Sequence, residues 1–329
     1  MPSLVLRPPP VQMLAHPLLS DKGVQLAVLR LDLIHPAVQG NKWFKLKHNL
    51  AAVREAGVTR VLSFGGAFSN HLYALAAAGE ALGLETIGAV RGEIIEPLNP
   101  VLRSARTRGM HLCAVSRARY RLLRELPEEL LFSNALDALD IHSEARQFID
   151  DLRRRFGEFA VIPEGGGNRL AALGCEEIAD YCDWGVFDAI EHCDLPKKRV
   201  VALCCGTATT MAGVVNVFAA RAVPSERSPF VQGISVLRSK GYLHEELNAK
   251  LSSAGGACNW DIDERFDFGG YAKRPLRLRG FTNRFKRATG IPIEPVYTGK
   301  LFYALWRRIA RDEYPVGTQI IAVHTGGIV

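Results

Sequence analysis

The sequence predicts an α/β protein built around parallel β-sheet. Short apolar segments alternate with longer segments of helical periodicity, and several connections from strand to helix contain glycine. This rhythm is typical of parallel sheets that are covered by helices on both faces. With 329 residues the chain exceeds the usual size of a single core, so two compact units or one large α/β unit are expected.

The first part of the chain has a clear strand-loop-helix pattern. Residues 25–31 alternate like a strand, and residues 38–41 then turn into a helix that is expected from Lys42 to Ala56. Residues 58–64 predict a short apolar strand. After a glycine turn, Ser69 or Asn70 caps an alanine-rich helix that ends near Gly83.

The same pattern continues to the end of the chain. Two further short apolar runs read as strands that are buried on both faces, and the segments between them have helical character. The expected strands are 85–90, 110–115, 160–163, 200–204, 231–236 and 319–324, and the expected helices are 102–109, 143–156 and 211–220.

Composition excludes several functional classes. The net charge of +7 comes from basic residues that are dispersed and that accompany no nucleic-acid-binding motif, so no nucleic-acid partner is expected. Seven cysteines without a CxxC pair or a paired Cys/His spacing predict reduced structural thiols and no metal site. No apolar run is long enough to cross a bilayer, and the N-terminus lacks the pattern of a secretory signal. A cytoplasmic protein is the resulting expectation.

Lys42 is the most informative residue when it is considered with three distant loops. A lysine is usually a solvent-facing charge. Here it stands at a predicted helix start, and the chain also has several loops of glycine and hydroxyl residues that precede helices. An aldehyde cofactor with a phosphate requires such a set. The three loops, 63–71, 162–168 and 205–213, together with Lys42 predict pyridoxal 5'-phosphate as the cofactor.

Each requirement of that cofactor has a candidate residue. Lys42 is the amine that would hold the aldehyde as a Schiff base, and the charge of Lys45 is expected to lower its pKa. A phosphate would be bound by backbone N–H groups and hydroxyls at a helix N-terminus. The candidates for this phosphate cup are Gly206, Thr207, Ala208, Thr209 and Thr210. The loop matches neither the Walker A motif nor GxGxxG, which argues against a nucleotide.

The substrate side has weaker candidates. Ser69 and Asn70 at a helix start could bind a carboxylate, and the Asn70 amide could reach the phenolic oxygen of the cofactor, although both also fit a plain helix cap. His71 is interpreted as a residue of the capping face in preference to an acid. Tyr271 and Tyr297 follow turns that contain glycine or proline and would suit proton transfer, although half-buried structural tyrosines are commoner.

Several motifs, taken in order, resemble the 1-aminocyclopropane-1-carboxylate deaminase and D-cysteine desulfhydrase family. They are GNKWFKLKHNL from Gly40, SFGGAFSNH from Ser63, VIPEGGGN from Val161, the turn at Tyr271, EPVYTGK from Glu294 and HTGG from His324. The resemblance extends over almost the whole chain. It implies a tryptophan synthase β-like fold (fold type II) with two open, twisted α/β domains and the cofactor in the cleft between them. Residues 1–45 and 156–329 would form the large domain, and residues 46–155 the small one.

The resemblance also implies roles for individual residues. Lys42 would be the Schiff-base lysine, Ser69 and Asn70 the substrate and cofactor contacts, and Tyr271 and Tyr297 the two active-site tyrosines. Deaminases of the family carry Glu after the second tyrosine and Leu before the final Gly-Gly, whereas this chain has Thr298 and Thr325, as desulfhydrases do. Both threonines would lie near the cofactor, and His71 near the substrate. β-Elimination from D-cysteine or an analogue, giving pyruvate, ammonia and sulfide, is the implied reaction.

Departures from the family pattern concern the substrate side. Ala208-Thr209 replaces a more glycine-rich cup, and Leu72-Tyr73 follow Ser69-Asn70-His71 where polar residues are common. The turn at Tyr271 lacks the usual Tyr-Gly-x-Pro form, and the family's C-terminal helix is expected to be absent because the sequence ends at Gly326-Gly327-Ile328-Val329. Three alternatives therefore stay open. They are aminocyclopropane carboxylate deamination, another lyase or dehydratase reaction, and a regulatory homologue that binds the cofactor without turnover. A homodimer is expected, from the resemblance and because symmetric dimers are common.

Overall fold

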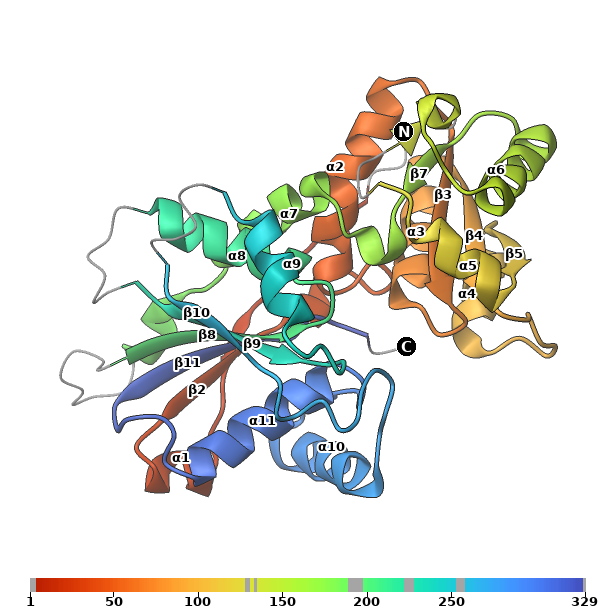
Figure 1. The fold of residues 1–329 in the computed structure, drawn as a ribbon. Helices are drawn as coiled ribbons and strands as arrows, with labels where there is room; N and C mark the ends of the chain where they lie inside the picture. The colour runs from red at the N-terminus through yellow and green to blue at the C-terminus, as the bar shows by residue number, and fades with distance from the viewer. Residues whose placement is uncertain are drawn as a thin grey trace.

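The protein contains two β-sheets, each surrounded by helices. The structure is a computed structural model that describes residues 4–127, 131–132, 135–188, 198–221, 228–252 and 258–327. Residues 328–329, on which the expectation about a C-terminal helix depends, lie outside the described residues. Figure 1 shows the two sheets as separate bodies with helix α2 between them. The predicted parallel α/β architecture is confirmed.

The larger sheet has six strands drawn from both ends of the chain. Its order is β1 (Val11–Met13), β2 (Gln25–Leu29), β11 (Thr318–Val323), β8 (Lys198–Cys205), β9 (Phe230–Ser235) and β10 (Trp260–Asp263). All neighbouring strands are parallel except β1 and β2, which pair antiparallel. The last strand of the chain, β11, therefore lies between β2 and β8.

The smaller sheet has five strands in the order β5 (His111–Val115), β4 (Glu85–Arg91), β3 (Arg60–Gly66), β7 (Ala160–Ile162) and β6 (Leu131–Phe132). Strands β5, β4, β3 and β7 are parallel, and β6 pairs antiparallel with β7. Because β7 pairs with β3, the smaller unit reaches Ile162. The boundary predicted at residue 156 therefore falls short, since it assigned this strand to the other domain.

Eleven α-helices connect the strands in the described part of the chain. Helix α2 begins one residue before the predicted start and crosses the predicted domain boundary at residue 45 without a break. The helices are α1 (Pro17–Asp21), α2 (Asn41–Glu55), α3 (Asn70–Leu82), α4 (Pro100–Thr107), α5 (Arg117–Leu123), α6 (Ser143–Phe156), α7 (Arg169–Glu176), α8 (Thr209–Ala220), α9 (Tyr242–Lys250), α10 (Leu276–Thr289) and α11 (Thr298–Ala310). None of them combines the length and the apolar character that a membrane span requires.

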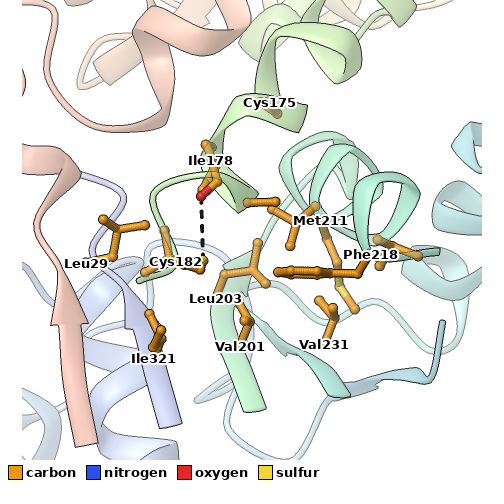
Figure 2. Close-up of a cluster of buried hydrophobic side chains, with 14 of the residues drawn as sticks. Leu29, Cys175, Ile178, Cys182, Val201, Leu203, Met211, Phe218, Val231 and Ile321 are labelled. Carbon is orange, nitrogen blue, oxygen red and sulfur yellow. Dashed lines mark hydrogen bonds between the residues drawn. The ribbon is translucent and has the colours of Figure 1, made fainter. Parts of the chain in front are cut away.

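Both faces of the larger sheet are buried, because side chains along each strand alternate between two hydrophobic clusters. Leu29, Leu203 and Ile321 point into the cluster beneath α7 and α8, which Figure 2 shows. Their strand neighbours Val28 and Ala202 belong to the opposite cluster, which α10 and α11 cover. Free cysteines are part of the first cluster, so they contribute apolar packing as predicted.

Helix α7 packs very closely against both α2 and α8. Gly174 on α7 lies against the carbonyl group of Phe44 on α2, where a Cβ atom would overlap the oxygen. On α8, a Cβ atom at Gly213 would lie 2.5 Å from the carbonyl oxygen of Ala172. Glycine removes the side chain that would otherwise hold the helices apart. These two contacts fix the start of α2 relative to the start of α8.

Candidate functional site

A single cavity collects most of the residues predicted to act. Its volume is about 790 Å³. Residues of both the larger and the smaller unit line it, including those at the ends of β3, β4 and β8 and at the start of α2. This is where an open α/β fold binds ligands, outside the carboxyl ends of parallel strands. The predicted residues that line it are Lys42, Lys45, Ser69, Asn70, His71, Gly206, Thr207, Ala208, Thr210, Tyr271, Tyr297 and Thr325.

Lys42 lies at the first turn of α2 and faces the cavity. The preceding Gly40 has a φ of +67° and lies so close to the backbone of Thr325 that a Cβ atom would overlap it. The Lys42 Nζ donates to Asn41 Oδ1 at 2.6 Å. Enclosure by the protein, and then the charge of Lys45, lower the Lys42 pKa to about 8. The predicted effect of Lys45 is present, but desolvation is the larger cause.

We expect Lys45→Met to shift the pH at which Lys42 becomes reactive. Removal of the neighbouring positive charge raises the Lys42 pKa, so the neutral amine forms only at higher pH. The rate at which the apoprotein acquires visible absorbance with saturating pyridoxal phosphate should rise with pH through about 8 in the wild type. Its midpoint should lie at higher pH in Lys45→Met and stay unchanged in Lys286→Met, an exposed lysine on α10. An unchanged or lower midpoint in Lys45→Met contradicts this assignment.

The loop between β8 and α8 forms a cup of donors. Ala208 adopts a φ of +55°, which turns the chain into the helix and brings the backbone N–H groups of the first turn toward the cavity. Lys45 Nζ donates to Thr207 Oγ1 at 3.1 Å, so a second cation borders the cup. Asn41 Nδ2 donates to Thr210 Oγ1 at 2.8 Å and connects the cup to α2.

The Thr209 side chain lies beneath the cup and does not face the cavity. The residue is fully buried and is absent from the cavity lining. Its hydroxyl donates to the carbonyl of Thr207 at 3.1 Å and also lies 3.2 Å from Thr207 Oγ1. The structure therefore makes Thr209 a support for the loop, with only its backbone available to a ligand.

Ser69 caps α3, as predicted, by accepting a hydrogen bond from the Leu72 N–H at 3.3 Å. His71 follows in the first turn of α3, and its side chain is buried with Nε2 2.9 Å from Ser63 Oγ. Ser63 Oγ donates its own proton to the carbonyl of Ile162 at 2.8 Å, so it accepts from a protonated Nε2. Enclosure, with Lys42 and Lys45 nearby, lowers the His71 pKa to about 3 and keeps it neutral.

The two predicted tyrosines meet in the cavity. Tyr297 donates its hydroxyl proton to Tyr271 at 3.2 Å, and the rings are 5.9 Å apart. Enclosure raises the Tyr297 pKa well above its usual value, so this phenol is a neutral donor. Lys300 secures the turn beneath Tyr271, because its buried Nζ donates to the carbonyls of Val236, Asp267 and Gly270 at 2.7–2.8 Å. Sequence reasoning assigned no role to Lys300.

Glu294 is a cavity residue that the sequence analysis missed. Its carboxylate accepts from the backbone N–H groups of Val296, Tyr297 and Thr298 at 2.6–2.9 Å and so caps α11. Enclosure raises its pKa. Its position three residues before Tyr297, at a helix start, is a capping signal that could have identified it.

The two threonines that were expected near the cofactor occupy different places. Thr298 is fully buried, its hydroxyl accepts from the Glu294 N–H at 3.0 Å, and it is absent from the cavity lining. Thr325 lines the cavity, and its hydroxyl lies 3.0 Å from Cys204 Sγ. Burial raises the pKa of this cysteine to about 11, so it is a neutral thiol.

These residues fit pyridoxal 5'-phosphate. The cavity contains an amine whose pKa burial lowers, Lys42, and a cup of backbone N–H groups and hydroxyls at the start of α8, which a second lysine, Lys45 of α2, borders. A phosphate needs such donors, and an aldehyde needs such an amine. No cluster of three or more His, Cys, Asp or Glu suited to a metal occurs among the residues that the structure describes.

Comparisons with known proteins agree with this geometry. No family model matches the chain. A Pyrococcus horikoshii protein provisionally named a 1-aminocyclopropane-1-carboxylate deaminase is 26% identical over 328 residues, covering 97% of this chain and 89% of that protein. A bifunctional D-cysteine desulfhydrase/1-aminocyclopropane-1-carboxylate deaminase of Arabidopsis thaliana, described as mitochondrial, is 26% identical over 332 residues, covering 93% and 73%. The crystal structure of an ACC deaminase homologue matches with a TM-score of 0.74 and 23% identity over 99% of this chain and 91% of that one. The fold is tryptophan synthase β-like, as the motifs predicted.

Proposed function

From the premise that this chain is a homologue of the 1-aminocyclopropane-1-carboxylate deaminase and D-cysteine desulfhydrase family of pyridoxal phosphate-dependent lyases, we propose that it catalyses β-elimination from a small amino acid. D-Cysteine or an analogue is the proposed substrate. The observation that carries the proposal is the position of Lys42, an amine of lowered pKa that lines the same cavity as the α8 cup.

Each step has a residue of this chain in position. When bound, pyridoxal phosphate supplies an electron-accepting ring that stabilises negative charge on the α-carbon. The Ser69 hydroxyl and the N-terminus of α3 would bind the substrate carboxylate. Lys42 would accept the α-proton, since its pKa of about 8 leaves part of the amine neutral near physiological pH. The Cβ–S bond would then break, with the electron pair leaving on sulfur.

The tyrosine pair would assist the leaving group. Tyr297 and Tyr271 share a hydrogen bond at the cavity surface, and a neutral phenol can give a proton to the departing thiolate. Water would then hydrolyse the released aminoacrylate to pyruvate and ammonia. The products of D-cysteine would be pyruvate, ammonia and sulfide.

Two observations support elimination over ring opening. Thr298 is uncharged where the resemblance implies that deaminases have a carboxylate, and Thr325 brings a hydroxyl to the cavity where they have leucine. The carboxylate that does line the cavity, Glu294, already accepts three backbone hydrogen bonds. Deamination of 1-aminocyclopropane-1-carboxylate is the second candidate, and the names of the relatives support it.

A substrate comparison tests the proposal. The holoenzyme would be given D-cysteine, L-cysteine, β-chloro-D-alanine and 1-aminocyclopropane-1-carboxylate separately, with pyruvate, 2-oxobutyrate and sulfide measured. We expect pyruvate from D-cysteine and β-chloro-D-alanine, with sulfide only from cysteine. Consumption of the cyclopropane alone, with 2-oxobutyrate as product, replaces elimination by ring opening. No 2-oxoacid from any of the four compounds removes both candidates.

A further inference from the structure

The lining of the cavity carries more positive charge than a cofactor and a small neutral substrate side chain require. Five cationic side chains line the cavity, against two carboxylates. Lys42 and Lys45 lie at the cofactor position described above. The other three cations are Arg91, Arg124 and Arg274.

One of these three arginines is already neutralised. Arg124 Nε lies 2.9 Å from Glu164 Oε2, and the other oxygen of Glu164 accepts from the Tyr120 hydroxyl at 2.7 Å. Both oxygens of this carboxylate are therefore engaged. Glu294, the other carboxylate, is committed to the backbone N–H groups of α11. Within the described residues, neither Arg91 nor Arg274 forms an ion pair.

Arg91 lies beside the loop that would bind the substrate carboxylate. It ends β4 and is in register with Gly66 of β3, the residue from which the chain continues to Ser69. A Cβ atom at Gly66 would lie 4.0 Å from Arg91 Nη2, and the guanidinium stacks 5.7 Å from the centre of the Tyr120 ring. The arginine is exposed but has a fixed place at the cavity edge. An orientation held by stacking favours bidentate binding of a carboxylate.

Arg274 reaches the same cavity from the other unit. It stands three residues after Tyr271 in an exposed segment whose turn Lys300 secures. Apolar side chains line the same cavity as the two arginines. They include Phe68, which is 70% exposed, and Val101. A lining that combines apolar and cationic side chains suits a substrate side chain with an uncharged stem and a charged end.

We propose that the site takes an amino acid whose side chain ends in a second carboxylate, which Arg91 and Arg274 bind. This inference rests on the proposed function, because it names the substrate class of the same site. The leaving group would be a thiolate that carries the carboxylate. The Cβ–S bond breaks with its electron pair going to sulfur, the α-proton goes to Lys42, and pyruvate and ammonia follow as above.

A matched pair of thioethers tests the proposal. S-Carboxymethyl-D-cysteine and its uncharged amide, S-carbamoylmethyl-D-cysteine, have nearly equal size and differ in charge. We expect kcat/KM for the acid to exceed that for the amide by about tenfold, because a charge-assisted bidentate contact is worth roughly that factor. The ratio should fall toward one in the Arg91→Gln, Arg274→Gln double variant, mainly through KM. Arg279→Gln, an exposed arginine on α10 that does not line the cavity, should keep the wild-type ratio.

A binding measurement separates this inference from the reaction. D-Glutamate and D-glutamine have no leaving group on the β-carbon, so calorimetric titration into the holoenzyme reports recognition alone, and the L enantiomers serve as a second pair. In one outcome, the acid binds more tightly than the amide in the wild type and equally in the double variant, while no substrate undergoes elimination. That result keeps the inference and removes the proposed function. The inference is overturned, and the proposed function kept, if D-cysteine is turned over while kcat/KM is equal for the acid and the amide. The same conclusion follows if the double variant retains the preference for the acid.

Discussion

Lys42→Ala is expected to lower elimination activity by at least about 10³-fold. The Lys42 side chain would both hold the cofactor covalently and accept the α-proton. General acid-base catalysis alone typically contributes about 10²–10⁴-fold to the rate. The visible absorbance that borohydride bleaches in the wild type should also disappear, because the variant lacks the amine. The measurement is kcat for pyruvate release together with the absorption spectrum, before and after borohydride.

Two controls make the Lys42 result specific. Lys286→Ala removes an exposed lysine of α10 and should leave the spectrum and the activity at wild-type values. Circular dichroism and the thermal midpoint of Lys42→Ala show whether the variant is folded. We expect it to fold, because the Lys42 side chain donates a hydrogen bond to its chain neighbour Asn41 and to no other described residue. A folded Lys42→Ala protein that keeps the bleachable absorbance assigns the covalent link to another lysine.

Gly174→Ala should destabilise the protein and weaken cofactor binding together. The added methyl group would overlap the carbonyl oxygen of Phe44, so α7 and α2 must separate. Overpacking of this kind costs typically about 1–3 kcal/mol, and the better helix propensity of alanine offsets roughly 1 kcal/mol of it. Since Phe44 is two residues from Lys42, the displacement also moves the amine relative to the α8 cup. We expect a lower denaturation midpoint and a higher Kd for pyridoxal phosphate.

The control for Gly174 is the same substitution where a helix has room. At Gly280 on α10 a Cβ atom would meet the end of the Arg284 side chain at 3.3 Å, which can move away. Gly280→Ala should therefore leave cofactor affinity unchanged and keep or slightly raise stability. Equal denaturation midpoints and equal Kd values for the two variants contradict the close packing of α2 against α7.

Much of the fold could be predicted because its strands are buried on both faces. Residues 200–204 and 320–323 are continuous apolar runs within the predicted strands, and in the structure they alternate between two separate clusters. Helix α2 and helix α3 were predicted within one residue of their starts, because Gly40 and Ser69 are strong local signals. The C-terminal boundary of the smaller unit was harder to predict from the sequence. Strand β7 is three residues long, and only its pairing with β3 assigns it to that sheet.

Some residues of the site could be predicted from local sequence signals, whereas others depend on long-range contacts. Lys42, Ser69 and the α8 cup lie at helix starts, where sequence carries capping signals, and the structure brings them into one cavity. The burial of Thr298 and the contribution of Glu294 depend on how the turn before α11 folds around a carboxylate. The neutral state of His71 depends on its enclosure and on the nearby charges of Lys42 and Lys45, which come together only in the folded protein. Such contacts come from packing and leave no periodic pattern in the chain.

The place of β11 in the larger sheet has a consequence for the order in which the protein folds during synthesis. All five strands of the smaller sheet lie within residues 60–162, so they leave the ribosome long before β11 at residues 318–323. The larger sheet cannot join β2 to β8 until that last strand is made, and pairing over such a separation in sequence is intrinsically slow. The nascent chain is therefore expected to carry a formed smaller unit beside an open sheet. Its need for protection from aggregation should be greatest just before β11 appears.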